Sequence, residues 1–248
     1  MIGIVSAGGY VPRYRLSAKT LGAVWGAGGA GERAVATYDE DSLTMAVEAS
    51  LNALHGRDAR GIGACFLAST SAPYAEKSSA AILATVMDLP PAVLTADVGG
   101  SLRCGTTALR LALDSVKAGS TAQALVAAAD LRPVAPGTAE EAQIGDGAGA
   151  VLVGNRDVIA TFEGAYAASH DFTDVWRLQG DRYLNVLPDM TFVKAYGLDK
   201  HIAEAVEGLL EATGRKREDI AKLVLYAPDA RTHAIRRVED EQIGRAHV

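Results

Sequence analysis

The sequence predicts a layered α/β fold built on a central, mostly parallel sheet. Short apolar segments of the strand type alternate along the chain with segments whose apolar residues recur at helical spacing. This alternation is typical of repeated β-α units, in which helices cover the faces of a sheet. The composition agrees, because 49% of the 248 residues are hydrophobic. A chain of this kind buries a substantial core.

Five strands are expected in the first part of the chain. Residues 124–129 are apolar throughout, as is usual for a strand buried on both faces. Gly8 and Gly9 are interpreted as a turn that ends the first strand. A further segment, residues 158–169, is expected to return beside the last strand. The predicted strands are residues 1–7, 64–69, 93–98, 124–129 and 147–154.

Three helices connect these strands, and each has recognisable end signals. Asp41 or Ser42 caps the first helix, whose apolar face ends at Leu54 before Gly56. The second helix, residues 77–87, stops before Pro90, since proline disfavours helical backbone in the residue that precedes it. The third helix covers residues 101–117 and ends before Gly119.

A second, similar half begins further along the chain. It has a helix at residues 202–213, a strand at 223–226 and another helix from His233, and the pattern then stops. We therefore predict a complete N-terminal half at residues 1–155 and a partial C-terminal half at 156–242. Residues 243–248 resemble translated sequencing-adapter DNA, so we expect a non-native tail there and a longer biological chain.

Composition and charge exclude several classes of protein. A net charge of −6 argues against a nucleic-acid partner. No apolar run approaches the ~18 residues of a membrane span, and the first residues do not form a signal peptide. The two cysteines lie in apolar segments, which suits a reducing cytoplasm, and the histidines show no metal-ligand spacing.

The most informative stretch is residues 95–109, which combines a strand, a Gly-Gly turn and the first turns of a helix. The amino end of a helix stabilises an anionic thiolate or oxyanion. Acyl-transferring enzymes often present a nucleophile in this way.

Several segments, in the same order, resemble the 3-hydroxy-3-methylglutaryl-CoA synthases of archaea and bacteria. The similarity extends from Met1 to about Arg231, and its order along the chain makes it specific. The matching segments are residues 32–46, 68–77, 104–109, 145–150 and 171–177.

The resemblance implies the thiolase-like fold of layered αβαβα type, with a complete first half and an incomplete second half. It also implies an acyltransferase of the mevalonate pathway that condenses acetyl-CoA with acetoacetyl-CoA. The expected substrates are coenzyme A thioesters, with no separate cofactor and no metal. The expected partners are a second copy or a thiolase-like protein, and a small OB-type zinc-binding module.

In this family a cysteine accepts the acetyl group, a glutamate acts as general acid/base and a histidine anchors the second thioester. Carried over by motif, these three positions fall on Leu102, Thr70 and Tyr226. None of the three residue types is retained. Tyr226 is the candidate catalytic residue, whereas Thr70, Ser101 and Leu102 are candidate substrate-binding residues.

Each neighbouring group has a structural interpretation beside the functional one. Cys104 is either a small buried hydrophobic residue or a displaced nucleophile, and its position two residues beyond Leu102 turns it away from the pocket. Ser101 is either a helix cap or a pocket residue. Tyr226 either packs at the end of an apolar strand or moves a proton.

Three candidate functions follow from these residues. The first is the family's condensation of acyl-CoA thioesters. The second is aldol-type cleavage of a CoA thioester by a lyase that needs no nucleophile, with Tyr226 as proton carrier. The third is an inert acyl-CoA-binding partner of an active thiolase-like protein.

Overall fold

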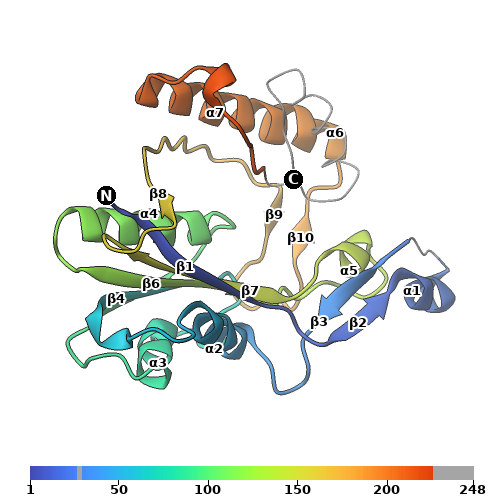
Figure 1. Cartoon of the computed structure of the whole chain (residues 1–248). Coiled ribbons are helices and arrows are strands. Elements are labelled where there is room, and N and C mark those ends of the chain that lie inside the picture. The colour runs from blue at the N-terminus through green and yellow to red at the C-terminus, as the bar shows by residue number, and fades with distance from the viewer. Residues whose placement is uncertain (27–29, 226–248) are drawn as a thin grey trace. The chain divides into compact units, whose positions relative to one another are not determined.

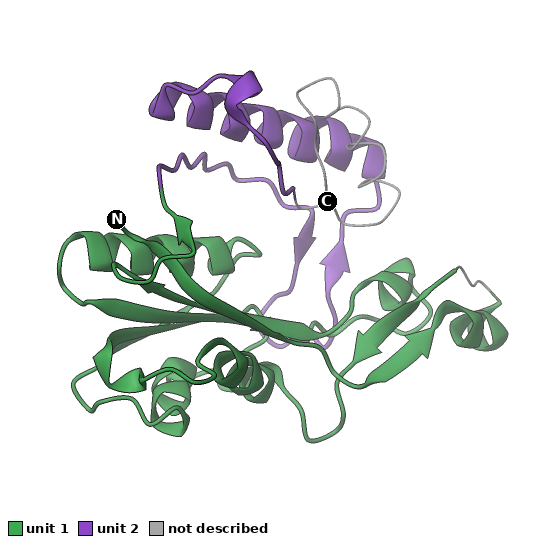
Figure 2. Ribbon diagram, viewed as in Figure 1, with its two compact units in different colours: residues 1–162 green, residues 163–248 purple. Residues whose placement is uncertain are grey.

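A computed structural model describes residues 1–26 and 30–225 of the chain. The chain divides into two compact units, Met1–Phe162 and Glu163–Val248 (Figure 2). The domain limits expected from the sequence, 1–155 and 156–242, and the non-native tail at 243–248 stay predictions.

The first unit is built on a six-stranded sheet with the strand order β5-β4-β6-β7-β1-β8 (Figure 1). Strand β4 is parallel to both β5 and β6, whereas β6–β7, β7–β1 and β1–β8 are antiparallel pairs. The sheet is therefore mixed. Its strands are β1 (Gly3–Tyr10), β4 (Ile62–Ala68), β5 (Leu94–Val98), β6 (Gln123–Asp130), β7 (Gly147–Gly154) and β8 (Ala160–Thr161).

The expectation of a mostly parallel sheet was wrong, and the connection from β6 to β7 explains why. A parallel crossover usually contains a helix that runs back along the sheet. Here the connection holds only α5 (Ala139–Gln143), about 8 Å long, against about 26 Å for the eight residues of β6. The chain therefore turns back as an antiparallel strand. The expected return of residues 158–169 beside β7 was also wrong, since β8 pairs with β1.

Strand β1 continues through Gly8 and Gly9, where the sequence suggested a turn. A β-carbon on Gly8 would lie 2.3 Å from the backbone nitrogen of Ala53 in helix α2. Gly8 therefore allows helix α2 to pack closely on strand β1, and it does not reverse the chain.

Helices cover both faces of this sheet (Figure 1). Helices α2 (Ser42–Ala53) and α3 (Ser79–Val86) pack on one face, and α4 (Cys104–Lys117) packs on the other. Asp41 caps α2 as expected, with its side chain accepting from the amide of Thr44 in a capping box. Each face buries its own apolar cluster, so the layered α/β prediction is confirmed.

Further elements of the first unit were not expected from the sequence. Strands β2 (Tyr14–Ser17) and β3 (Glu32–Val35) pair antiparallel. Helix α1 (Ala18–Trp25) lies between them in the chain and is capped by Ser17. A short 3₁₀ turn, Ala59–Gly61, precedes β4.

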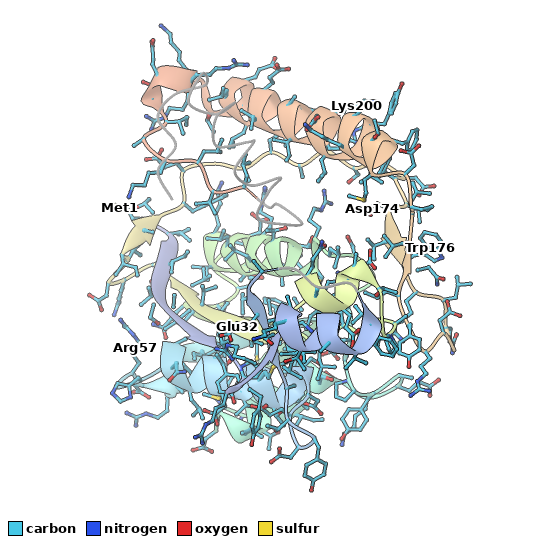
Figure 3. All side chains as sticks on the ribbon, turned by 90° about the vertical axis from the view of Figure 1, so that its right-hand side faces the viewer. Met1, Glu32, Arg57, Asp174, Trp176 and Lys200 are labelled. Carbon is cyan, nitrogen blue, oxygen red and sulfur yellow. The ribbon has the colours of Figure 1, made fainter. Side chains whose placement is uncertain are left out.

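The second unit contains a small strand pair and a helical segment. Trp176 lies on β9, and Lys200 begins α7 (Figure 3). Residues 223–225 are not in a strand, contrary to the prediction, and the helix expected from His233 lies outside the described residues. The elements are β9 (Val175–Trp176), β10 (Asn185–Val186), α6 (Met190–Phe192), a π-helical stretch (Val193–Asp199), α7 (Lys200–Thr213) and a 3₁₀ turn (Arg217–Asp219).

None of the helices in the described part of the chain is both long enough and apolar enough to cross a membrane.

Candidate functional site

The candidate site is the edge of the first unit at which β4, β5 and β6 end. These strands are parallel, so their carboxyl ends meet at one edge of the sheet. Ligands of open α/β sheets bind outside this edge. The turn after β4 carries Thr70, and the turn after β5 carries Ser101 and Leu102. The fold thus brings three of the four predicted site residues to the same edge.

The turn after β4 is held by the carboxylate of Asp130, the last residue of β6. Its Oδ1 accepts from the backbone amide of Thr70 at 2.7 Å and from the Thr70 hydroxyl at 3.1 Å. The hydroxyls of Ser69 and Ser71 donate to the same oxygen, at 3.1 and 3.0 Å. Thr70 is therefore fixed by both its backbone and its side chain.

The turns after β4 and β5 touch through their backbones. The amide of Ser69 donates to the carbonyl of Val98 at 3.1 Å. A β-carbon on Gly99 would lie 3.1 Å from the carbonyl oxygen of Ser69, so a glycine suits this close approach. Gly100 then turns the chain with a φ of +76° toward helix α4, a conformation that glycine adopts without strain.

Helix α4 begins later than the sequence suggested, at Cys104 instead of Ser101. The Ser101 hydroxyl accepts from the amide of Arg103 at 3.2 Å, and its carbonyl accepts from the amide of Cys104 at 2.9 Å. Ser101 therefore closes a turn before the helix, and Arg103 occupies the cap position. The interpretation of Ser101 as the helix cap was wrong, while its binding role stays a prediction.

Leu102 and Cys104 face different environments. Leu102 lies in the turn with 46% of its surface exposed, whereas Cys104 is 6% exposed and packs in the apolar cluster under α4. Burial, followed by the nearby charge of Asp130, raises the pKa of the Cys104 thiol. A buried neutral thiol is a poor nucleophile. The interpretation of Cys104 as a small buried hydrophobic residue is confirmed.

Comparison with known proteins identifies the family. The chain is 34% identical over 241 residues to a hydroxymethylglutaryl-CoA synthase of Methanocaldococcus jannaschii, an alignment that covers 93% of this chain and 69% of the relative. A synthase of the same name from Thermococcus onnurineus is 35% identical over 236 residues, covering 93% and 67%. The chain belongs to the hydroxymethylglutaryl-CoA synthase family. It spans about two thirds of the length of these relatives, and no protein-family model matches it.

Solved structures show that this family member has the thiolase-like fold. An HMG-CoA synthase complexed with CoA superimposes with a TM-score of 0.86 at 22% identity, covering 97% of this chain and 64% of that one. A 3-oxoacyl-(acyl carrier protein) synthase III of Pseudomonas aeruginosa gives a TM-score of 0.81 at 22% identity, covering 98% and 80%.

The hydroxymethylglutaryl-CoA synthase resemblance assigned Tyr226 to the histidine position, but this residue lies outside the described part of the chain. Sequence reasoning missed Asp130. The available signal was an acidic residue directly after an apolar strand, together with a Ser-Thr-Ser turn after the neighbouring strand. Parallel pairing of the two strands brings these groups together.

The second unit contains a separate cavity of about 300 Å³. Phe172 packs on Gly197, where a β-carbon would lie 2.6 Å from the ring. The rings of His170 and His201 stack at 4.5 Å, and His170 contacts Glu204 at 2.7 Å. The described residues include no cluster of three or more side chains suited to a metal ion.

Proposed function

We propose that this protein binds acyl-CoA thioesters and forms a carbon–carbon bond between them, in a condensation of the hydroxymethylglutaryl-CoA synthase type. The observation that carries the proposal is the alignment with synthases of this name over 93% of the chain. Solved structures of similar fold, one with CoA and one with 3-hydroxy-3-methylglutaryl-CoA, support the substrate class.

In this proposal Thr70, Ser101 and Leu102 contact the thioester at the carboxyl edge of the sheet, and Tyr226, at the family's histidine position, donates a hydrogen bond to the second thioester. The exposed side chain of Leu102 offers an apolar contact and no acyl acceptor. We therefore place the reacting acyl group on coenzyme A and not on the protein. The carbon–carbon bond itself requires a base and an oriented carbonyl, not a covalent carrier.

A second candidate is aldol-type cleavage of a CoA thioester. Leu102 at the nucleophile position and the burial of Cys104 favour it, because cleavage of this kind needs no acyl-enzyme. The proposal also includes a cytoplasmic location and assembly with a second copy or a thiolase-like partner. An OB-type zinc-binding module is the further partner that the family resemblance suggests.

The test combines product analysis with a search for acyl-enzyme. Purified protein is incubated with ¹⁴C-acetyl-CoA, with and without acetoacetyl-CoA, and products are separated by chromatography. We expect a labelled condensation product and no label on denatured protein. Protein-bound label that is lost in Cys104→Ala would instead make Cys104 the acyl acceptor. Thioester binding without any product would leave the inert binding partner as the function.

The variant Leu102→Cys tests whether a thiol restored at position 102 accepts an acetyl group. Its thiol would lie at the amino end of α4, at the family's nucleophile position. Stable acetylation at position 102 in this variant, with none in Leu102→Ser, would support the assignment of this turn to the thioester site. Binding of acetyl-CoA that is unaffected by any change at position 102 would remove Leu102 from the site.

A further inference from the structure

The carboxylate of Asp130 is placed to do more than hold a turn. Four hydrogen bonds converge on its Oδ1, one from an amide and three from hydroxyls. Among the described residues no hydrogen bond reaches its Oδ2. One oxygen is therefore anchored, and the other keeps its lone pairs available for a proton.

The direction of the side chain follows from the alternation of β6. Ala124 and Val126 pack in the apolar cluster under α4, with Ala128 against it, whereas Leu125, Ala127 and Ala129 pack under α2 and α3. Successive side chains of a strand point to opposite faces, so Asp130 lies on the face covered by α4. A β-carbon on Gly105 would lie 3.4 Å from that of Ala128. Asp130 thus stands beyond Ala128, close to the first turn of α4.

The carboxylate of Asp130 therefore lies between the two turns that carry the candidate residues Thr70 and Leu102. On one side it bonds Thr70, and on the other its charge acts on Cys104, two residues after Leu102. It is partly buried, so water weakens its interactions less than those of a surface carboxylate. Asp97, at the carboxyl end of β5, has a structural role instead, because both of its oxygens accept amides of Ser79 and Ala80 at the start of α3.

We infer that Asp130 is the acid/base group of this site. Its Oδ2 takes a proton from the carbon next to the thioester carbonyl of a bound acyl-CoA. The electron pair of that C–H bond becomes the new carbon–carbon bond to the ketone carbon of the second thioester. The oxygen left on that carbon then takes the proton from Asp130. Nothing is oxidised or reduced, and the inference rests on the proposed function.

The hydroxyls of Ser69, Thr70 and Ser71 around Oδ1 can support the uptake and return of a proton by Asp130. They orient the carboxyl group and rotate to donate to it when it is charged. Ser71 also accepts from the amide of Leu131 at 2.8 Å and Ser69 accepts from the amide of Ser71 at 3.0 Å, so the network is itself anchored to the backbone. A carboxylate held in this way is preorganised, because it need not reorient when the proton moves.

The test is exchange of the acetyl protons of acetyl-CoA in D₂O, followed by NMR, because exchange needs the base and no second substrate. Asp130→Asn keeps an acceptor oxygen and removes the proton site. We expect its exchange rate to fall by about 100-fold or more, with acetyl-CoA affinity and thermal stability close to wild type. Asp97→Asn, which removes a carboxylate from the end of the next strand, is the matched control and should exchange at the wild-type rate.

Moving the carboxylate from position 130 to position 70 distinguishes a role in proton transfer from a role in holding the turn. Thr70→Glu places a carboxyl group on the residue whose amide lies 2.7 Å from Asp130 Oδ1. Combined with Asp130→Asn, it should recover exchange to within about tenfold of wild type. In the wild-type background it puts two carboxylates together and should shift the pH profile of exchange toward higher pH.

Each outcome decides between the two proposals. Loss of exchange in Asp130→Asn with recovery in the double variant supports the acid/base assignment. Unchanged exchange in Asp130→Asn, or a loss that Thr70→Glu fails to recover, overturns it and leaves the proposed function standing. Wild-type protein that binds acetyl-CoA without exchange also overturns it. Wild-type protein that does not bind acetyl-CoA overturns the proposed function together with the inference.

Discussion

The turn after β4 and the turn after β5 end at the same edge of one sheet, yet they are held in different ways. The first is fixed by a carboxylate from a neighbouring strand, through four hydrogen bonds. The second is shaped by glycines and by local bonds of Ser101, and it leaves Leu102 half-exposed.

The two turns also differ in the reactive groups that they carry. In the family resemblance both turns carry reactive groups, a glutamate on the first and a cysteine on the second. Here the second turn holds an apolar side chain, and its nearest thiol is buried. The first turn carries no carboxylate of its own at Thr70 and is held by one from β6, that of Asp130. Under the proposals above, this edge keeps a group for proton transfer and has no exposed thiol to accept an acyl group.

The largest difference between the two turns is expected in the reactivity of thiols placed near them. Burial raises the pKa of Cys65 to about 12, so its thiolate fraction at neutral pH is about 1000-fold below that of an ordinary thiol. Burial also raises the pKa of Cys104. In Leu102→Cys the new thiol is exposed at a helix amino end, and we expect iodoacetamide to label it about 1000-fold faster than Cys65. Mass spectrometry of the peptides measures each rate, and equal labelling of positions 102 and 104 would contradict the burial of Cys104.

The two turns should also differ in how much each contributes to the stability of the fold. Asp130→Ala leaves three hydroxyls and an amide of the first turn without their shared acceptor, and we expect it to lower the free energy of unfolding by about 3 kcal/mol. Leu102→Ala, in the exposed second turn, should change it by less than about 0.5 kcal/mol. Urea unfolding measures both. A cost at Leu102 as large as that at Asp130 would mean that the second turn is packed and not open.

The sequence predicted the strands of this edge better than its chemistry. The apolar runs of β4 and β6 are long enough to define buried strands, and the Gly-Gly pair marks the turn after β5. The layered fold was therefore predictable from local patterns, whereas Thr70 and Leu102 were singled out by the family resemblance. Gly8 was misread because close packing on α2 and a turn both favour glycine.

Asp130 could not be found by the same reasoning, since its role depends on which strands are neighbours. It lies 60 residues from Thr70 in the chain, and only the parallel pairing of β4 with β6 brings the two together. The order of the strands also depends on non-local pairing, in particular that of β1 with β7. Local patterns specify elements, whereas the polar contacts at the ends of strands follow from topology.

The smallest effect is expected at Asp146, another carboxylate near this edge, whose environment differs from that of Asp130. It precedes β7, is 8% exposed and accepts from the amide of Ala36 at 2.8 Å. Burial raises its pKa, opposed by that amide and by the charge of Arg33. A raised pKa in the folded state favours the neutral acid. The stability that Asp146 contributes is therefore present at low pH and is lost as pH rises through the folded-state pKa.

Asp146→Asn remains neutral at every pH and keeps an acceptor oxygen for Ala36. We expect its stability relative to wild type to increase as pH rises from about 3 to about 7, by less than the effect at Asp130. Urea unfolding of both proteins across this range measures the difference. A constant difference would show that burial does not disfavour the charged form of Asp146. The anchoring of Asp130 by four donors, against the amide of Ala36 at Asp146, would then be the clearest structural difference between the two carboxylates.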